Sequence, residues 1–324
     1  EIEIGGQRID KHYGHWLDIW NELTDHDEQE WIGLNKHAAK DAYLNSDGLL
    51  GKSRAQRLYV PLQFWFCRNP GLALPLIALQ YHEVKVKLTT RAMGALVVGD
   101  YAAAVTAAAP TSVQLWADYI YLDTDERRRF AQVSHEYLIE QLQKEEGTDK
   151  TTMNLNFNHP VKELIWVNQD ADVLGEVANN AAGSDVSLNV GGLAMGQGND
   201  FFNYEGAAAK TEERIAGVAS NESFGDMKLQ LNGHDRFAAR NASYFRTCQP
   251  LQAGHKVPSK HIYCYSFALK PEEHQPSGTC NFSRIDNAQM VFGGDAPTGT
   301  LTVYAVNYNV LRIMSGMGGL AYSN

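Results

Sequence analysis

Residues 261–287 have the sequence HIYCYSFALKPEEHQPSGTCNFSRIDN, and this stretch decides the fold. Small or aliphatic residues alternate in it with Tyr263, Tyr265 and Phe267. A period of two residues predicts a β-strand with one aromatic face. Pro271 lacks the amide donor that strand pairing requires, so the strand ends before it. The turn-forming residues 276–278 (PSG) follow, and a second extended run begins at Phe282. Two strands separated by a proline-bounded excursion predict one corner of an antiparallel β-sandwich.

The same plan occurs twice in the chain. Residues 2–9 (IEIGGQRI) align with residues 229–237 (LQLNGHDRF) when one residue is inserted. Each copy is followed by a segment that carries aromatic residues and then by a proline-bounded pair of strands, at residues 58–88 and 261–292. The preserved order of three features predicts two copies of one antiparallel domain, although short strand-turn fragments can also match by chance. We expect the domains to span residues 1–130 and 131–324.

Hydrophobic periodicity predicts the individual elements. Trp16, Ile19, Trp20 and Leu23 follow helical spacing, so residues 13–23 are expected to form an amphipathic helix that packs on a sheet. A short charged helix is expected at residues 123–132. The predicted strands are residues 58–66, 79–88, 113–122, 135–143, 152–157, 164–167, 227–231, 262–269, 288–292 and 301–312.

The second copy has strands ahead of its glycine-turn hairpin, whereas the first copy begins at the hairpin itself. We therefore expect the first domain to lack its opening strands in this sequence, as an N-terminally incomplete version of a longer protein or with those strands supplied from elsewhere.

Composition excludes several classes of protein. The chain has 324 residues, of which 44% are hydrophobic and 20% charged, as in an ordinary globular protein. Its formal net charge of −10 argues against a surface that coats nucleic acid. No apolar run approaches the ~20 residues that a transmembrane helix needs. The longest candidate, residues 71–79, is short and includes Pro75.

Motifs for catalysis, cofactors or metals are missing from the sequence. His82-Glu83 and His135-Glu136 do not continue to a second histidine at the HExxH spacing. Neither a nucleophile elbow nor a phosphate-binding loop occurs. The four cysteines lack metal-type spacing and favour a reducing compartment, although pairing of Cys248 with Cys280 stays open. We therefore expect a protein that is not an enzyme and carries no cofactor.

The residue identities in four segments are more specific than the hydrophobic pattern of these segments. Residues 265–287 (YSFALKPEEHQPSGTCNFSRIDN), 1–13 (EIEIGGQRIDKHY), 59–88 (YVPLQFWFCRNPGLALPLIALQYHEVKVKL) and 307–324 (NYNVLRIMSGMGGLAYSN) resemble the major capsid proteins of nucleocytoplasmic large DNA viruses, of the chlorella-virus type in particular. The resemblance extends from the first residue to the last, with divergent loops between the segments.

This resemblance implies an all-β double jelly roll, the first one lacking its N-terminal strands, with short helices in loops. It further implies a structural protein that self-assembles as trimeric, pseudo-hexagonal capsomers of an icosahedral shell. Neighbouring capsomers and minor capsid proteins would be its partners, without direct contact to nucleic acid. The protein would lie in the outer capsid shell of a virion assembled in the host cytoplasm, with the loops 25–47, 93–110 and 169–221 forming outer towers or intersubunit contacts.

Three N-x-[ST] sequons make Asn221, Asn241 and Asn281 candidates for glycosylation, with Asn281 expected to be the least accessible. The resemblance implies that capsid surfaces of this kind can carry glycans, also at atypical acceptor sites. Two other functions remain open. One is a minor or vertex capsid protein of the same fold. The other is a glycan-binding jelly-roll module, for which Trp16 with Trp20, or Tyr263 with Tyr265, would be exposed platforms.

Overall fold

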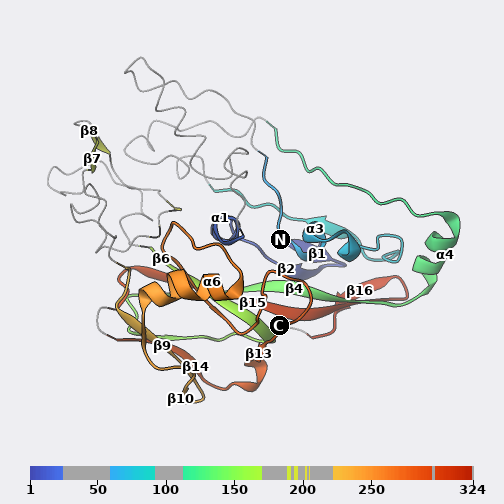
Figure 1. Cartoon of the computed structure of the whole chain (residues 1–324). Helices are drawn as coiled ribbons and strands as arrows, with labels where there is room; N and C mark the ends of the chain where they lie inside the picture. The colour runs from blue at the N-terminus through green and yellow to red at the C-terminus, as the bar shows by residue number, and fades with distance from the viewer. Residues whose placement is uncertain are drawn as a thin grey trace.

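The computed structural model describes residues 1–24, 59–91, 112–169, 188–190, 193–195, 201–202, 204, 222–293 and 296–322. The strands of this part pair antiparallel throughout, and the helices are short (Figure 1). The predicted β architecture with short helices is confirmed. The expected loops at 25–47 and 93–110 lie outside the described residues. Within 169–221 the structure describes little more than the hairpin of β7 (Leu188–Val190) and β8 (Leu193–Met195).

The second half of the chain is a sandwich of two sheets. A six-stranded sheet has the order β12-β6-β15-β16, with β13 paired to β6 and β4 paired to β15. A five-stranded sheet has the order β10-β9-β14-β5, with β11 paired to β9. The bounds of these strands are β4 His135–Thr148, β5 Thr152–Asn154, β6 Pro160–Gln169, β9 Asp226–Leu231, β10 His234–Asp235, β11 Arg240–Asn241, β12 Ile262–Ser266, β13 Cys280–Asn281, β14 Ala288–Gly293, β15 Thr300–Met314 and β16 Met317–Leu320.

An aromatic core fills the space between these two sheets. Trp166, Phe245 and Tyr263 are fully buried in it, with Met227 and Met290 from the smaller sheet. The aromatic face of the strand after residue 261 therefore points into the sandwich. Burial of several aromatic side chains supplies a large part of its stability.

Short helices connect the strands. The charged connector is α4 (Thr124–Gln132), capped by the Asp123 carboxylate, which accepts from the amide of Glu126 at 2.8 Å. Before β12 the chain forms the π-helical turn η6 (Tyr244–Cys248) and α6 (Gln249–Ala253). The turn η7 (Phe282–Arg284) follows β13.

The described part of the first half contains a three-stranded sheet in the order β2-β1-β3, formed by β1 (Ile2–Ile4), β2 (Gln7–Asp10) and β3 (Val84–Val86). Its helices are α1 (Gly14–Leu23), α3 (Trp65–Arg68) and the 3-10 turn η2 (Pro70–Leu72). This sheet and α3 share a core with the far ends of the long strands β4 and β15, in which Ile4 and Trp65 lie with Ile139 and Leu311.

Helix α1 lies on the outer face of the six-stranded sheet (Figure 1). Trp16, Ile19, Trp20 and Leu23 are all buried there, against side chains that include Tyr304. The helix, its apolar stripe and its packing on a sheet are confirmed.

The two predicted glycine-turn hairpins are also confirmed. In the first hairpin Gly5 and Gly6 have φ of 57° and 85°, and in the second Asn232 and Gly233 have φ of 50° and 80°. Two consecutive residues with positive φ give a two-residue turn whose twist matches that of paired strands. Both hairpins, β1–β2 and β9–β10, are followed by helical segments.

Several predicted strands are wrong or shorter than expected. Residues 58–66 end in helix α3, residues 113–122 form no strand, and only Val84–Val86 of residues 79–88 is paired. Residues 282–284, expected to be extended, form a 3-10 turn. These runs have β-prone composition, but β-propensity describes the fit to a partner strand, and no described residue supplies one beside residues 59–64 or 113–122.

Candidate functional site: the charged seam between the two halves

The described residues contain no group of three side chains suited to hold a metal ion, and no helix among them is long and apolar enough to cross a bilayer. The two His-Glu pairs have structural contacts. His82 Nδ1 lies 2.9 Å from the carbonyl oxygen of Gly318, and His135 Nε2 lies 2.8 Å from that of Phe130. The buried charges of the described residues gather instead in β4, β6 and the loop around His255 of the second half, where Arg68 of the first half contacts them.

A β-bulge in β6 creates this seam. Val306 of β15 is opposite Glu163, whereas the next residue, Asn307, is opposite Val161, so Lys162 is the extra residue. A bulge interrupts the alternation of side chains along a strand. Lys162 and Glu163 are consecutive, yet both are fully buried. Each must therefore be paired, because an isolated buried charge is very costly.

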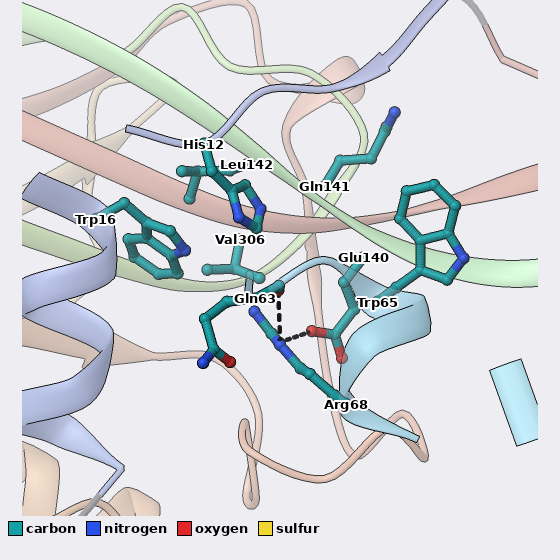
Figure 2. Close-up of a pocket in the computed structure, with 9 residues that line it drawn as sticks. All are labelled: His12, Trp16, Gln63, Trp65, Arg68, Glu140, Gln141, Leu142 and Val306. Atoms are coloured by element: carbon teal, nitrogen blue, oxygen red, sulfur yellow. Dashed lines mark hydrogen bonds and ion pairs between the residues drawn. The ribbon is translucent and has the colours of Figure 1, made fainter. Parts of the chain in front are cut away.

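Lys162 belongs to the first of two ion-pair chains. Its ammonium group lies 2.7 Å from Glu140 Oε1 on β4, and the other oxygen of Glu140 lies 2.7 Å from Nη1 of Arg68 on α3 (Figure 2). The Arg68 guanidinium also lies 4.5 Å from the Trp20 ring of α1, in cation–π geometry. This chain thus joins two helices of the first half to two strands of the second half.

Glu163 belongs to the second chain, in which His255 lies between two carboxylates. His255 Nε2 is 2.9 Å from Glu163, and Nδ1 is 2.7 Å from Glu272. Burial alone lowers the pKa of His255, but the two carboxylates outweigh it and raise the pKa to about 9. Burial also works to raise the pKa of Glu163, but His255 and Lys162 lower it overall. The imidazolium and the carboxylate are therefore the forms present at neutral pH.

The two chains together balance three cations against three carboxylates: Arg68, Lys162 and His255 against Glu140, Glu163 and Glu272. Trp20 contacts both chains, since its ring also lies edge-on to His255 with 6.2 Å between centroids. A paired and hydrogen-bonded set of buried charges defines one arrangement of the elements that carry it.

Further polar contacts hold the start of the chain on the second half. The Asp18 carboxylate of α1 lies 2.7 Å from both Lys260 Nζ and the Tyr204 hydroxyl. The Asp10 carboxylate accepts from the backbone amide of Leu142 on β4, an edge strand, at 3.0 Å. Covering an edge amide in this way prevents the strand from pairing elsewhere at this point.

Two cavities lie beside the seam. The smaller one has 10 Å³, room for about one water molecule, and is lined by residues that include His12, Trp16 and Arg68 (Figure 2). The larger one, of 210 Å³, opens beside Arg68, Glu140 and Glu272. Small-molecule sites usually have about 300–1,000 Å³ and a mostly apolar lining. The arrangement therefore fits a rigid joint rather than a ligand site.

Of the glycosylation candidates, Asn241 and Asn281 lie on the surface, and Asn221 lies outside the described residues. Asn281 is exposed, as Asn241 is, and the expected order of accessibility among the three stays a prediction. In both sequons the asparagine Oδ1 accepts from the backbone amide of the serine two residues later, at 3.1 Å. The sites lie on different strands, and glycosylation stays a prediction.

The aromatic platforms expected for a glycan-binding module are absent, because Trp16, Trp20 and Tyr263 are buried. Cys248 and Cys280 are both free. Sequence reasoning missed the seam. Its signal was a Lys-Glu pair inside the otherwise apolar strand of residues 161–167 (VKELIWV), since adjacent charges in a buried strand require partners.

Comparisons with known proteins agree with this architecture. The family model described as large eukaryotic DNA virus major capsid protein matches residues 126–319, and the model described as major capsid protein N-terminus matches residues 1–123. The major capsid protein of Pyramimonas orientalis virus is 47% identical over 100% of this chain and 76% of its own length. That of Paramecium bursaria Chlorella virus 1 is 43% identical over 100% of this chain and 78% of its own length.

A solved structure described as the quasi-atomic model of the PBCV-1 virus capsid matches 100% of this chain and 83% of its own chain, with 38% identity and a TM-score of 0.70. A second solved structure, of PBCV-1 VP54 fitted into a reconstruction of the Sputnik virophage, gives 37% identity and a TM-score of 0.68. The predicted double jelly roll is confirmed by this likeness. The chain belongs to the family of major capsid proteins of large eukaryotic DNA viruses.

Proposed function

We propose that the chain is the structural subunit of the outer shell of a large icosahedral DNA virus and acts as a trimer that forms pseudo-hexagonal capsomers. The observation that carries this proposal is the likeness to the PBCV-1 capsid protein over the whole of this chain, and the Arg68–Glu140 ion pair that joins the two halves supports it. The relatives are structural proteins rather than enzymes.

The geometry supports a role in tiling. We assign the two domains to residues 1–130 and 131–324, and the two family models meet close to this boundary, at residues 123 and 126. Two similar domains per chain, taken three times, give six wedges of similar shape around one axis. The wedges fit a hexagonal lattice only if the domains of one chain keep a fixed orientation, and the contacts of Arg68 with Glu140 and of Trp20 with His255 across the boundary would favour one orientation.

Partners and location follow from this role. Neighbouring capsomers and minor capsid proteins would contact the subunit, and glycans on Asn221, Asn241 or Asn281 would face the outside. The formal net charge of −10 suits a shell that does not touch the genome. Assembly would take place in the cytoplasm of the host cell.

Native mass spectrometry tests the central claim. A stable species of three times the 36.0 kDa chain mass is expected, and concentrated samples should form hexagonal arrays visible by electron microscopy. A protein that stays monomeric at every salt and protein concentration would contradict the proposal. Intact-mass measurement of virion-derived protein, followed by peptide mapping, tests glycosylation at the three asparagines.

A further inference from the structure

The smaller of the two cavities beside the seam combines apolar walls with buried ring nitrogens. It has a volume of 10 Å³, and nine described residues line it. His12 and Trp16 of the first half are among them, as are Leu142 and Val306 of the second half. The cavity therefore lies where the start of the chain meets strands β4 and β15.

The Trp16 indole presents a hydrogen-bond donor to this cavity. Trp16 is 1% exposed, and its Nε1 has no hydrogen-bond partner among the described residues. Figure 2 shows this nitrogen on the side of the ring that faces His12. The ring is held in place by Trp20 and Tyr304, whose ring centroids lie 5.3 and 5.5 Å away. An indole N–H donates and cannot accept, and a buried donor without a partner is costly, so the cavity must hold an acceptor.

His12 presents a second buried nitrogen. Its ring stacks on Phe64 with 4.4 Å between centroids, and its Nε2 lies 2.9 Å from Oδ2 of Asp10. Because Nε2 faces a carboxylate, that nitrogen carries a hydrogen. Nδ1 is also buried and has no hydrogen-bond partner in the part of the chain that the structure describes. Nδ1 accepts in the neutral imidazole and donates in the imidazolium, so a group that bonds it in both forms must be able to do either.

Water meets these requirements, whereas ions and organic ligands do not. A volume of 10 Å³ is at the lower limit for one water molecule and excludes organic ligands. A cation would meet the positive end of the Trp16 N–H bond and the charge of Arg68, which lines the same cavity. An anion would meet the charge of Glu140, another lining residue. A water molecule donates and accepts without adding a charge.

We propose that one ordered water molecule is bound in this cavity, accepts a hydrogen bond from Trp16 Nε1 and bridges it to Nδ1 of His12. A buried water molecule typically makes about three hydrogen bonds. Glu140 can accept the third, because a carboxylate has about four acceptor positions and Lys162 and Arg68 each contact one of its oxygens. The water molecule then connects the beginning of α1 to β4 and adds a bridge to the joint between the two halves.

Nuclear magnetic resonance of the intact chain tests the proposal. The protein is deuterated and labelled with nitrogen-15 only in its six tryptophans, and Trp16→Phe identifies the Trp16 signal. We expect cross-relaxation between the Trp16 indole hydrogen and a water molecule that stays bound for longer than the protein takes to tumble. Trp166 is the matched control, because its Nε1 is also buried without a partner among the described residues but lies in the core of the sandwich, and it should show no such signal. Trp116, which is 80% exposed, should show exchange with bulk water.

A crystal structure that shows ordered solvent locates the bound molecule. One isolated peak should lie within about 3.2 Å of both Trp16 Nε1 and His12 Nδ1. The peak should lose most of its occupancy in Trp16→Phe, which keeps an aromatic ring but removes the donor. It should be unchanged in Trp166→Phe, the matched control. Crystals soaked in bromide should show no anomalous signal at this position, because the site takes a neutral molecule.

Several results would overturn the inference. One is the lack of water cross-relaxation at Trp16 in a sample in which Trp116 exchanges with water. Others are an anomalous bromide signal in the cavity, a peak that keeps its occupancy in Trp16→Phe, and a cross-relaxation signal of equal size at Trp166. None of these results bears on trimer formation, so the inference and the proposed function are tested separately.

Discussion

The charge-neutralising variant Glu163→Gln tests how much the seam stabilises the fold. It keeps the shape of the side chain but leaves the buried imidazolium of His255 with Glu272 alone, whose side chain is partly exposed. The rise in the pKa of His255 from 6.5 to about 9 corresponds to about 3.4 kcal/mol in favour of the imidazolium, at 1.36 kcal/mol per tenfold change in protonation. Most of this belongs to Glu163, since it is fully buried. We expect the variant to lose about 2–3 kcal/mol of unfolding free energy at pH 7.

The pH dependence gives the prediction a second readout. The folded-state pKa of His255 is raised, so its contribution is complete below 6.5 and is lost as the pH rises through about 9. The folded-state pKa of Glu163 is lowered, so its contribution is complete above 4.5 and is lost as the pH falls through the folded value. Wild-type protein should therefore lose stability between pH 7 and 9.5, and Glu163→Gln should lose at most half as much there.

Urea unfolding followed by tryptophan fluorescence measures both effects. Glu273→Gln is the matched control, since Glu273 pairs with Lys270 on the surface, and it should change the unfolding free energy by less than about 0.5 kcal/mol. A double-mutant cycle with His255→Gln isolates the interaction between the two residues. The reasoning is refuted if Glu163→Gln costs less than about 1 kcal/mol, or if its loss of stability between pH 7 and 9.5 equals that of the wild type.

Three further predictions concern other parts of the molecule. Trp20→Ala should cost about 3–5 kcal/mol of unfolding free energy, because Trp20 is buried on the inner face of α1 against Trp16, Arg68 and His255. Trp116→Ala, at an exposed position, should change the unfolding free energy by less than about 0.5 kcal/mol. Gly5→Ala should be more destabilising than Gly6→Ala in the same turn. Both residues have positive φ, but a Cβ at Gly5 would lie 2.2 Å from the His82 ring, whereas a Cβ at Gly6 would meet nothing within 4 Å. Equal melting temperatures of the two variants would contradict this hairpin geometry. Asn241→Gln and Asn281→Gln should each remove one glycan mass from virion-derived protein, and an unchanged intact mass would exclude that position.

How well the sequence predicted each element depended on where its partners lie. Helix α1 was predicted well because its stripe of Trp16, Ile19, Trp20 and Leu23 is periodic within the segment. The hairpins were predicted because Gly5-Gly6 and Asn232-Gly233 determine the turn locally. Residues 113–122 were misassigned because their composition specifies a strand, while strand formation depends on another segment beside them.

The site was less accessible to sequence reasoning than the fold. The charged residues lie far apart in the sequence, with more than a hundred residues between Glu140 and Glu272. Only the bulge at Lys162 brings two adjacent charges, Lys162 and Glu163, into one buried layer. A bulge has no reliable sequence pattern when the residue involved is not glycine. The Lys-Glu pair showed that buried partners must exist, but not which residues they are.

The seam also explains why a shell protein would keep buried charges instead of an apolar joint. Apolar side chains of similar volume would often be as stable, so stability alone does not favour the ion pairs. An apolar interface tolerates sliding and repacking, however, whereas the charges here are satisfied only when their particular partners lie within hydrogen-bond distance. Arg68 can satisfy Glu140 only when α3 is seated on β4, and His255 can satisfy Glu163 only when the loop after α6 lies over β6. A subunit repeated many times in a lattice accumulates any error in the angle between its domains, so the specificity of the joint matters more for the proposed function than its strength.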